Sequence, residues 1–433
     1  MPKKVIIIGA GPSGVLLAHY LLRRKDNYQV DIYERRSDPR IVPFSKSRTY
    51  PITLSQRGMK ALRNIEGLEE AVKAISLEVT GTIIHQKNGK TSFITRQKPL
   101  ISLDRTRLAI ALLEKLTQKY DDSRLKVHFD CECTQVDFAK KQAKLQNPET
   151  KVDFTVDYNL LVGADGARSV VRESFLSTEN FECQQKYVPS AYKSIFLPSD
   201  NNLERNLQPG KIHSWRLDDT TSVLLLYQLD GTMSGVVTFP YKQNQVASLS
   251  HAQEVLKFFN ENFPEVGYLM PTSEAEAFVA RTVSRVSTIR CNRFHQGASA
   301  LLIGDAAHAV SPALGQGCNA ALEDVVIFDK ILDENSDNLA QAVEQFSVRR
   351  LPDAHALVEM SDYAFPLSKR LFIEFILRQR IAKILHRLFP QKFLPSLFEV
   401  ISEDTNSYSQ VLDYYKDWIA KVKKSNEKLT VRA

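Results

Sequence analysis

The chain has 433 residues and a net charge of +7, and 43% of its residues are hydrophobic. This length suffices for two or three domains with a sizeable core, and the composition is that of an ordinary soluble globular protein. Basic residues are scattered among acidic ones, which argues against nucleic acid as a partner. No stretch is apolar for long enough to cross a bilayer, so no transmembrane segment is expected.

The first elements predict a β-α-β unit. Residues 5–8 read as a buried parallel strand, residues 13–25 as a helix and residues 29–33 as a second strand that ends at Glu34. The start of the chain shows no leader with a cleavage site.

The turn after the first strand carries a dinucleotide-binding pattern. Gly9 permits the tight turn, Gly11 allows the backbone to approach a pyrophosphate, and Gly14 allows the helix to pack against the strand. Glu34, about twenty residues further on, is placed to accept hydrogen bonds from a ribose. The residues of the turn predicted to bind cofactor are Gly9, Gly11, Pro12, Ser13 and Gly14. This pattern alone does not distinguish FAD from NAD.

The middle of the chain alternates between helical and extended patterns. Helices are expected at 52–70, 104–119 and 251–263, and strands at 79–95, 125–156 and 185–240. From about residue 318 onward the pattern is helical. The five cysteines, Cys131, Cys133, Cys183, Cys291 and Cys318, follow no disulfide or metal spacing. They predict reduced thiols, no metal site and a cytoplasmic protein.

Two further glycine turns follow apolar strands. The segment 163–169 contains Asp165, which can orient backbone and cofactor groups, and Arg168, which we expect near phosphate. For Arg172, which follows it, we favour a surface salt bridge. In the segment 304–317, Asp305 can accept hydrogen bonds from ribityl hydroxyls. A helix beginning near Cys318 would offer backbone N–H groups to the pyrimidine edge of a flavin. This segment favours FAD, and its predicted contacts are Asp305, Pro312, Gly315, Gln316 and Gly317.

We therefore predict an α/β fold in which a Rossmann-like FAD-binding domain is interleaved with a strand-rich α+β insert and followed by C-terminal helices. The predicted FAD-binding segments are 1–75, 104–176 and 285–345. The predicted substrate-binding sheet domain comprises 76–103 and 177–284, and the C-terminal helical region is 346–433.

These three segments, in this order, resemble those of the class A flavoprotein monooxygenases of the aromatic hydroxylase type. The resemblance implies FAD, reduction by NADPH or NADH as a transient reductant, and O₂. It implies that a flavin C4a-hydroperoxide hydroxylates an aromatic small molecule. Residues that match the family's FAD contacts are Glu34, Arg36, Arg105, Asp305, Cys318 and Asn319. We expect Arg35 and Asp165 to bind the cofactor as well.

Within this family the chain most resembles the kynurenine 3-monooxygenases. They bind the substrate carboxylate with an arginine and a tyrosine, but the matching positions here are Thr82 (or Thr80) and Pro99, and a family asparagine matches Ala364. Only a late tyrosine is retained, as Tyr408. Without the arginine, the substrate carboxylate loses the bidentate hydrogen bonds that a guanidinium donates, so we expect kynurenine to be a poor substrate or none.

Aromatic side chains of the insert supply the substrate-pocket candidates, but no catalytic base is identified. The candidates are Tyr192, His213, Trp215, Tyr227, Phe239 and Tyr408. Three alternatives stay open: modification of a polyketide or tetracycline-type antibiotic, reduction of a double bond, and FAD binding without catalysis.

A basic amphipathic helix follows Leu371. We expect it to cover the active site, with weak association with a membrane surface as the alternative. The chain is expected to be a monomer or a homodimer.

Overall fold

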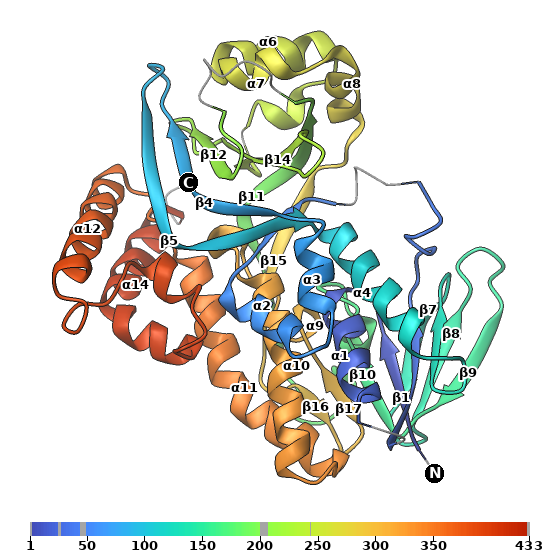
Figure 1. Ribbon diagram of the computed structural model, residues 1–433. Helices are drawn as coiled ribbons and strands as arrows, with labels where there is room; N and C mark the ends of the chain where they lie inside the picture. The colour runs from blue at the N-terminus through green and yellow to red at the C-terminus, as the bar shows by residue number, and fades with distance from the viewer. Residues whose placement is uncertain (1, 25–26, 44–48, 200–206, 243, 431–433) are drawn as a thin grey trace.

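The computed structural model describes residues 2–24, 27–43, 49–199, 207–242 and 244–430. Figure 1 shows two sheets with a layer of helices between and beside them, and a separate group of C-terminal helices at one side. The mixed α/β fold is as predicted.

The first sheet has six strands in the order β16-β17-β10-β1-β2-β6 and is parallel except at β16. Its central strand β1 is apolar and fully buried from Val5 to Ile8, as expected for a strand covered on both faces. Its strands are β1 (Lys3–Ile8), β2 (Tyr28–Tyr33), β6 (Leu125–His128), β10 (Leu160–Gly163), β16 (His295–Gln296) and β17 (Ala300–Leu302).

Three helices and a small sheet complete this unit. The helix α1 (Pro12–Leu22) packs beside the parallel sheet between α4 (Arg105–Lys119) and α10 (Gly317–Glu334), both of which contact it. A three-stranded meander connects β6 to β10 and consists of β7 (Glu132–Asp137), β8 (Gln142–Gln146) and β9 (Asp153–Asp157).

The second sheet has eight strands in the order β15-β11-β14-β13-β12-β4-β5-β3. The strands are β3 (Pro51–Leu54), β4 (Leu77–His85), β5 (Thr91–Asp104), β11 (Cys183–Leu197), β12 (Lys211–Arg216), β13 (Ser222–Tyr227), β14 (Met233–Pro240) and β15 (Ser284–Cys291). Three helices cover its outer face (Figure 1): α6 (Ala252–Asn262), α7 (Pro264–Leu269) and α8 (Thr272–Ala280).

The two faces of this large sheet differ in burial. On β14, Val237 and Phe239 are buried in the core beneath α6–α8, whereas Val236 and Thr238 are only half-buried. Side chains alternate between the faces of a strand, so the second face is the half-open one.

The C-terminal helices form their own apolar cluster, which also contains Leu314 and Ala320 of the loop before α10 and of α10 itself. These helices are α11 (Leu339–Asp362), α12 (Lys369–Leu388), α13 (Leu397–Val400) and α14 (Tyr408–Thr430). None of the helices in the described part of the chain has the length and apolarity needed to span a bilayer.

The sequence prediction for residues 52–70 is wrong in its first part. Residues 51–54 form the edge strand β3, which pairs with β5, and only then do the helices α2 (Gln56–Arg63) and α3 (Leu68–Lys73) follow. The predicted FAD segment 1–75 thus contributes one strand to the large sheet. The predicted boundary at residue 346 falls inside α11.

Candidate flavin site

The first two glycine turns lie against each other. Gly9 has φ +107°, and a Cβ atom there would stand 2.5 Å from the carbonyl oxygen of Ala164. A Cβ on Gly14 would stand 2.2 Å from the carbonyl oxygen of Gly9. Both positions exclude any side chain, so glycine is what allows β1, β10 and α1 to meet this closely.

The third turn joins them at the start of α1. Gly304 has φ +58°, and a Cβ there would lie 3.1 Å from the Ser13 hydroxyl oxygen. Three segments far apart in the sequence therefore converge at the carboxyl ends of β1, β10 and β17. In open parallel sheets, ligands bind at this edge.

Glu34 holds the first turn in place. One of its carboxylate oxygens accepts a hydrogen bond from the backbone N–H of Ala10 at 3.0 Å, and the other accepts one from the backbone N–H of Arg36 at 3.0 Å. The carboxylate thus stands at the end of β2 beside the glycine turn, where the dinucleotide pattern predicts a ribose contact.

Asp165 carries a buried oxygen that needs a donor. Its Oδ2 accepts from the backbone N–H of Val170 at 2.8 Å, but its Oδ1 is buried without a partner in the described part of the chain. Desolvation raises the pKa of this carboxyl. Because Asp165 lies directly against Gly9, a hydroxyl-bearing cofactor at the turn would satisfy this oxygen.

Asp305 is accessible to solvent and yet surrounded by protein, which indicates a hollow around its side chain. Its side chain is exposed, yet the surrounding protein raises the pKa of the carboxyl by desolvation. Desolvation also raises the pKa of Tyr50 and that of Cys318 to about 12. Arg105, predicted to contact FAD, lies 5.4 Å from the ring centre of Tyr50. These groups interact electrostatically and line one space; sequence analysis missed Tyr50, which belongs to no motif.

The loop before α10 is fixed by side chains beneath it. The Asn319 amide donates to the carbonyl oxygens of Thr53 and Gly315, each at 3.0 Å, and its oxygen accepts from the N–H of Ser55 at 2.8 Å. These bonds use both donors of Asn319, which gives it a positioning role. The N-terminus of α10, with N–H groups that lack helical partners, lies next to Cys318 and the hollow.

A buried charge network supports the third turn. Asp324, fully buried on α10, accepts from the N–H of Gly304 at 2.7 Å, from His308 Nε2 at 2.8 Å and from Arg350 Nε at 2.7 Å. Burial alone would raise the pKa of Asp324, but these partners hold it below its usual value. His308 is thus a structural residue of the turn.

Other predicted cofactor residues lie around the rim of the site. Arg35 is exposed, with a guanidinium nitrogen 3.8 Å from a carboxylate oxygen of Glu132, and Arg168 is exposed. Arg172, for which we favoured a surface salt bridge, is instead buried and donates to the carbonyl oxygens of Ala306 and Ala167. The Arg172 guanidinium therefore stabilises the turn that carries Asp305 by bonding to its backbone.

The pocket candidates separate into two groups. Tyr192 is half-buried and packs edge-on against Tyr50, with ring centres 6.3 Å apart, so it lies beside the hollow. Tyr408 is fully buried and donates to Gln316 Oε1 at 3.2 Å, so it supports the loop from below. The remaining four belong to the opposite side of the large sheet.

Those four side chains point toward α6–α8. Trp215, Tyr227 and Phe239 belong to the apolar core under these helices, and His213 is fully buried beside them. Their polar atoms have partners there, such as Glu265 for the Trp215 indole at 3.1 Å. Core packing explains their aromatic character, so we leave them out of the substrate pocket.

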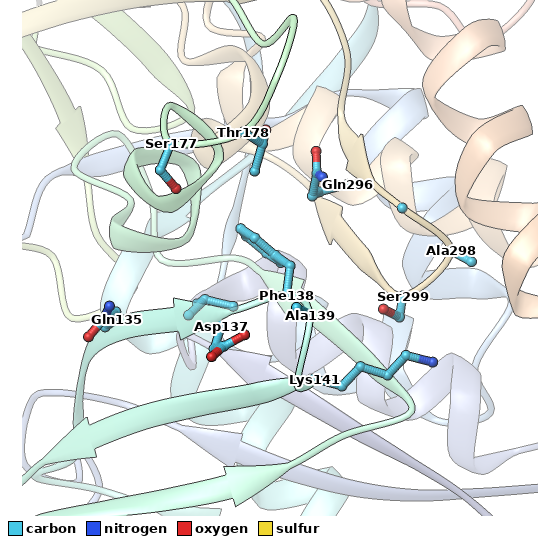
Figure 2. Close-up of a pocket in the computed structure, with 12 residues that line it drawn as sticks. Gln135, Asp137, Phe138, Ala139, Lys141, Ser177, Thr178, Gln296, Ala298 and Ser299 are labelled. Carbon is cyan, nitrogen blue, oxygen red and sulfur yellow. The ribbon is translucent and has the colours of Figure 1, made fainter.

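A separate surface hollow of about 590 Å³ lies at the other end of the parallel sheet. Figure 2 shows Asp137, Lys141 and Ser299 on its walls. Ser299 directly precedes β17, so this hollow adjoins the amino ends of the strands, away from the three glycine turns.

Comparison with known proteins identifies the family. Residues 3–361 match the family described as FAD binding domain. Kynurenine 3-monooxygenase of Sus scrofa is 30% identical over 415 residues, which cover 94% of this chain and 85% of that protein. Kynurenine 3-monooxygenase of Flavobacterium psychrophilum is 28% identical, over 95% of this chain and 90% of that protein. The chain belongs to the FAD-dependent aromatic monooxygenases.

Solved structures agree on the fold. A tetrameric 2-methyl-3-hydroxypyridine-5-carboxylic acid oxygenase has a TM-score of 0.70 at 18% identity, covering 93% of this chain and 96% of that one. Tetracycline destructase Tet(51) has a TM-score of 0.61 at 16% identity, covering 93% and 97%. At such identities the likeness shows the fold alone. The family favours oxygen insertion over the alternatives of double-bond reduction and FAD binding without catalysis.

We predict that Glu34→Gln weakens FAD binding about tenfold to a hundredfold, because a neutral amide replaces a charged acceptor of two backbone hydrogen bonds. Quenching of flavin fluorescence on titration of the apoprotein measures the dissociation constant. Glu132→Gln, a half-exposed carboxylate near the same turn, is the matched control and should bind FAD normally. Equal affinity of the Glu34 variant and wild type would contradict the assignment.

Proposed function

We propose that the protein hydroxylates a small aromatic acid bound between the half-open face of the large sheet and the C-terminal helices, next to the hollow around Asp305. The observation that carries this proposal is the convergence of three glycine turns on a space that Tyr50 and Tyr192 connect to the large sheet. A flavin seated at the turns would therefore face this sheet.

The composition of the half-open face supports an aromatic substrate. Its half-buried side chains are mostly apolar or hydroxyl-bearing, and they alternate with core residues along each strand: Thr82, Ile84, Tyr192, Ile212, Ser214, Leu224, Val236 and Thr238. Such a wall binds a ring by contact and excludes water from it. Exclusion of water protects the reactive oxygen species in this chemistry.

The chemistry divides between cofactor and protein. When bound, FAD takes two electrons from NADPH or NADH and activates O₂, so that one oxygen atom enters the ring and the other leaves as water. The glycine turns and Glu34 hold the dinucleotide, and the N-terminus of α10 stabilises negative charge at the flavin's pyrimidine edge. Tyr50 and Tyr192 orient the ring beside it.

We expect the purified holoenzyme to consume O₂ with NADPH faster when its aromatic acid is added, and the product to gain one oxygen atom by mass spectrometry. An oxygen electrode and a panel of aromatic acids measure this. L-kynurenine should give little stimulation, because positions 80 and 82 of β4, which match the arginine that binds the carboxylate in the kynurenine 3-monooxygenases, carry threonine. Robust kynurenine hydroxylation would contradict the substrate part, and anaerobic turnover without oxygen insertion would contradict the reaction.

One arginine near the half-open face forms no ion pair within the described part of the chain, although the charge of Glu399 acts on it from a distance. Arg96 lies in a bulge of β5, where residues 96–99 stand opposite Thr80 of β4. Its Nε is buried without a hydrogen-bond partner in the described part of the chain, and desolvation lowers its pKa. A buried Nε donor without a hydrogen-bond partner is costly, and an acid group of the substrate would offset that cost. We assign the substrate's carboxylate to Arg96.

Arg96→Gln should raise the KM of the best aromatic acid about tenfold to a hundredfold, because a charge-assisted pair is worth a few kcal/mol. The corresponding amide of the same ring should keep its KM in both proteins. Lys98→Gln removes an exposed neighbouring cation that pairs with Glu403 and serves as the matched control. Equal losses for acid and amide would show a structural role for Arg96 and contradict the assignment.

The helix α12 exposes an apolar stripe. Ile373, Leu377, Ile381, Ile384 and Leu388 recur every three or four residues and are each at least half exposed. Exposed arginines border the stripe at positions 370, 380 and 387. Apolar side chains bordered by cations fit an anionic membrane surface, so we propose weak association of α12 with such lipids. The helix also contacts the large sheet, since Arg216 lies 5.3 Å from the ring centre of Phe372.

The double variant Leu377→Glu/Ile384→Glu should lose co-sedimentation with vesicles that contain anionic phosphatidylglycerol, whereas neutral phosphatidylcholine vesicles should bind neither protein. Leu176→Glu places the same charge at another exposed leucine and is the control. If wild type ignores both vesicles and the double variant instead dissociates a dimer, the stripe is a contact between copies. A monomeric or dimeric state and a cytoplasmic location stay predictions.

A further inference from the structure

Two cysteines face each other where the chain crosses between the two sheets. Cys183 begins β11 and Cys291 ends β15, and the two residues are direct partners in this antiparallel pair. Their sulfur atoms lie 3.5 Å apart, with the Cys291 thiol donating to Cys183. The backbone N–H of Asn292 donates to the carbonyl of Glu182, so the neighbouring pair 183:291 is of the non-hydrogen-bonded type. In such pairs the Cα atoms are about 4.5 Å apart, within the range that a disulfide spans.

The surroundings make one of these thiols reactive. The hydrogen bond from Cys291, opposed by partial burial and reinforced by the positive charge of Arg172, lowers the pKa of Cys183 to about 7. Cys183 is also half-exposed, in a stretch of exposed residues, whereas Cys291 is buried. Desolvation instead raises the pKa of Cys131, which is exposed to a similar degree. Because Cys183 has the larger thiolate fraction and its side chain is accessible to solvent, we expect it to be the most reactive of the cysteines.

We propose that Cys183 and Cys291 form a peroxide-reactive dithiol that closes to a disulfide across β11 and β15. The Cys183 thiolate attacks hydrogen peroxide, which breaks the O–O bond and gives a sulfenic acid and hydroxide. The Cys291 sulfur then displaces the sulfenic oxygen as water, using its own proton. In sum, two thiols and one peroxide give one disulfide and two waters, with sulfur oxidised and peroxide reduced.

The oxidant is one that this enzyme class produces. A reduced flavin that reacts with O₂ without transferring an oxygen atom releases hydrogen peroxide, as it does in turnovers in which no substrate accepts the oxygen. The dithiol is also connected to the cofactor turn, because Arg172 donates to the carbonyl of Ala306, next to Asp305. Oxidation neutralises the thiolate that faces Arg172, at a point where the two strands join the flavin unit to the large sheet.

The test uses reduced wild-type holoenzyme treated with one to a few equivalents of hydrogen peroxide at neutral pH. Peptide mapping should find a Cys183–Cys291 linked peptide, loss of two of the five thiols, and full reversal by dithiothreitol. Cys183 should react about tenfold faster than Cys131, because its larger thiolate fraction outweighs the lower nucleophilicity of a more acidic thiol. NADPH added in air without substrate should form the same linkage, and catalase should prevent it.

Two variants separate the steps. Cys291→Ser should stop at a sulfenic acid on Cys183 that dimedone captures, and Cys183→Ser should leave Cys291 unoxidised. The proposal is overturned if no linked peptide forms in wild type, or if Cys131 reacts as fast as Cys183. Because the rates of Cys183 and Cys131 are compared within one wild-type molecule, this result does not depend on whether either variant folds.

Discussion

The flavin site depends on one buried carboxylate. Asp324 of α10 is fully enclosed. Its two oxygens accept from the backbone N–H of Gly304 and the imidazole of His308, which share one turn, and from the guanidinium of Arg350 in α11. A buried charge is tolerated only when it is paired and fully hydrogen-bonded, so these segments have little freedom to move apart. Gly304 begins the turn that Asp324 holds, and its positive φ directs the following residue, Asp305, into the hollow. The position of Asp305, a predicted FAD contact, is thus set by a fully buried charge on α10.

The same network extends to the C-terminal helices. Arg350 of α11 also donates to Glu323, which in turn pairs with Arg57 of α2. Both arginines lie against the ring of Tyr408, 5.6 Å and 4.3 Å from its centre. The network therefore links the cofactor turn to the last helix of the chain, and the C-terminal region acts as part of the flavin site and not as an appendage to it.

Local signals in the sequence were sufficient to predict that the three glycine turns belong to one site, and they converge in the structure. They were insufficient for the substrate side. Close approach of the backbone requires glycine at positions such as Gly9 and Gly14, and these glycines are visible directly in the sequence. The edge strand Pro51–Leu54 has no such local signal, because it forms by pairing with β5, about fifty residues away in the sequence. Arg172 looked like a surface cation for the same reason: the carbonyl groups that bury it come partly from the Asp305 turn.

Side chains alternate between the two faces of the large sheet, which explains why four of the aromatic candidates face α6–α8 and not the half-open face. Alternation along a strand separates two faces, but sequence does not say which one the helices cover. Tyr192 shares a face with Thr238, its partner on β14, whereas Phe239 one residue later faces α6–α8. Bulky aromatics suit that closed core, where they pack with aliphatic side chains such as Leu225, Met233 and Val255. A face that must receive a ring is better built from smaller half-buried side chains, which leave it the room that a cluster of tryptophan and phenylalanine would occupy.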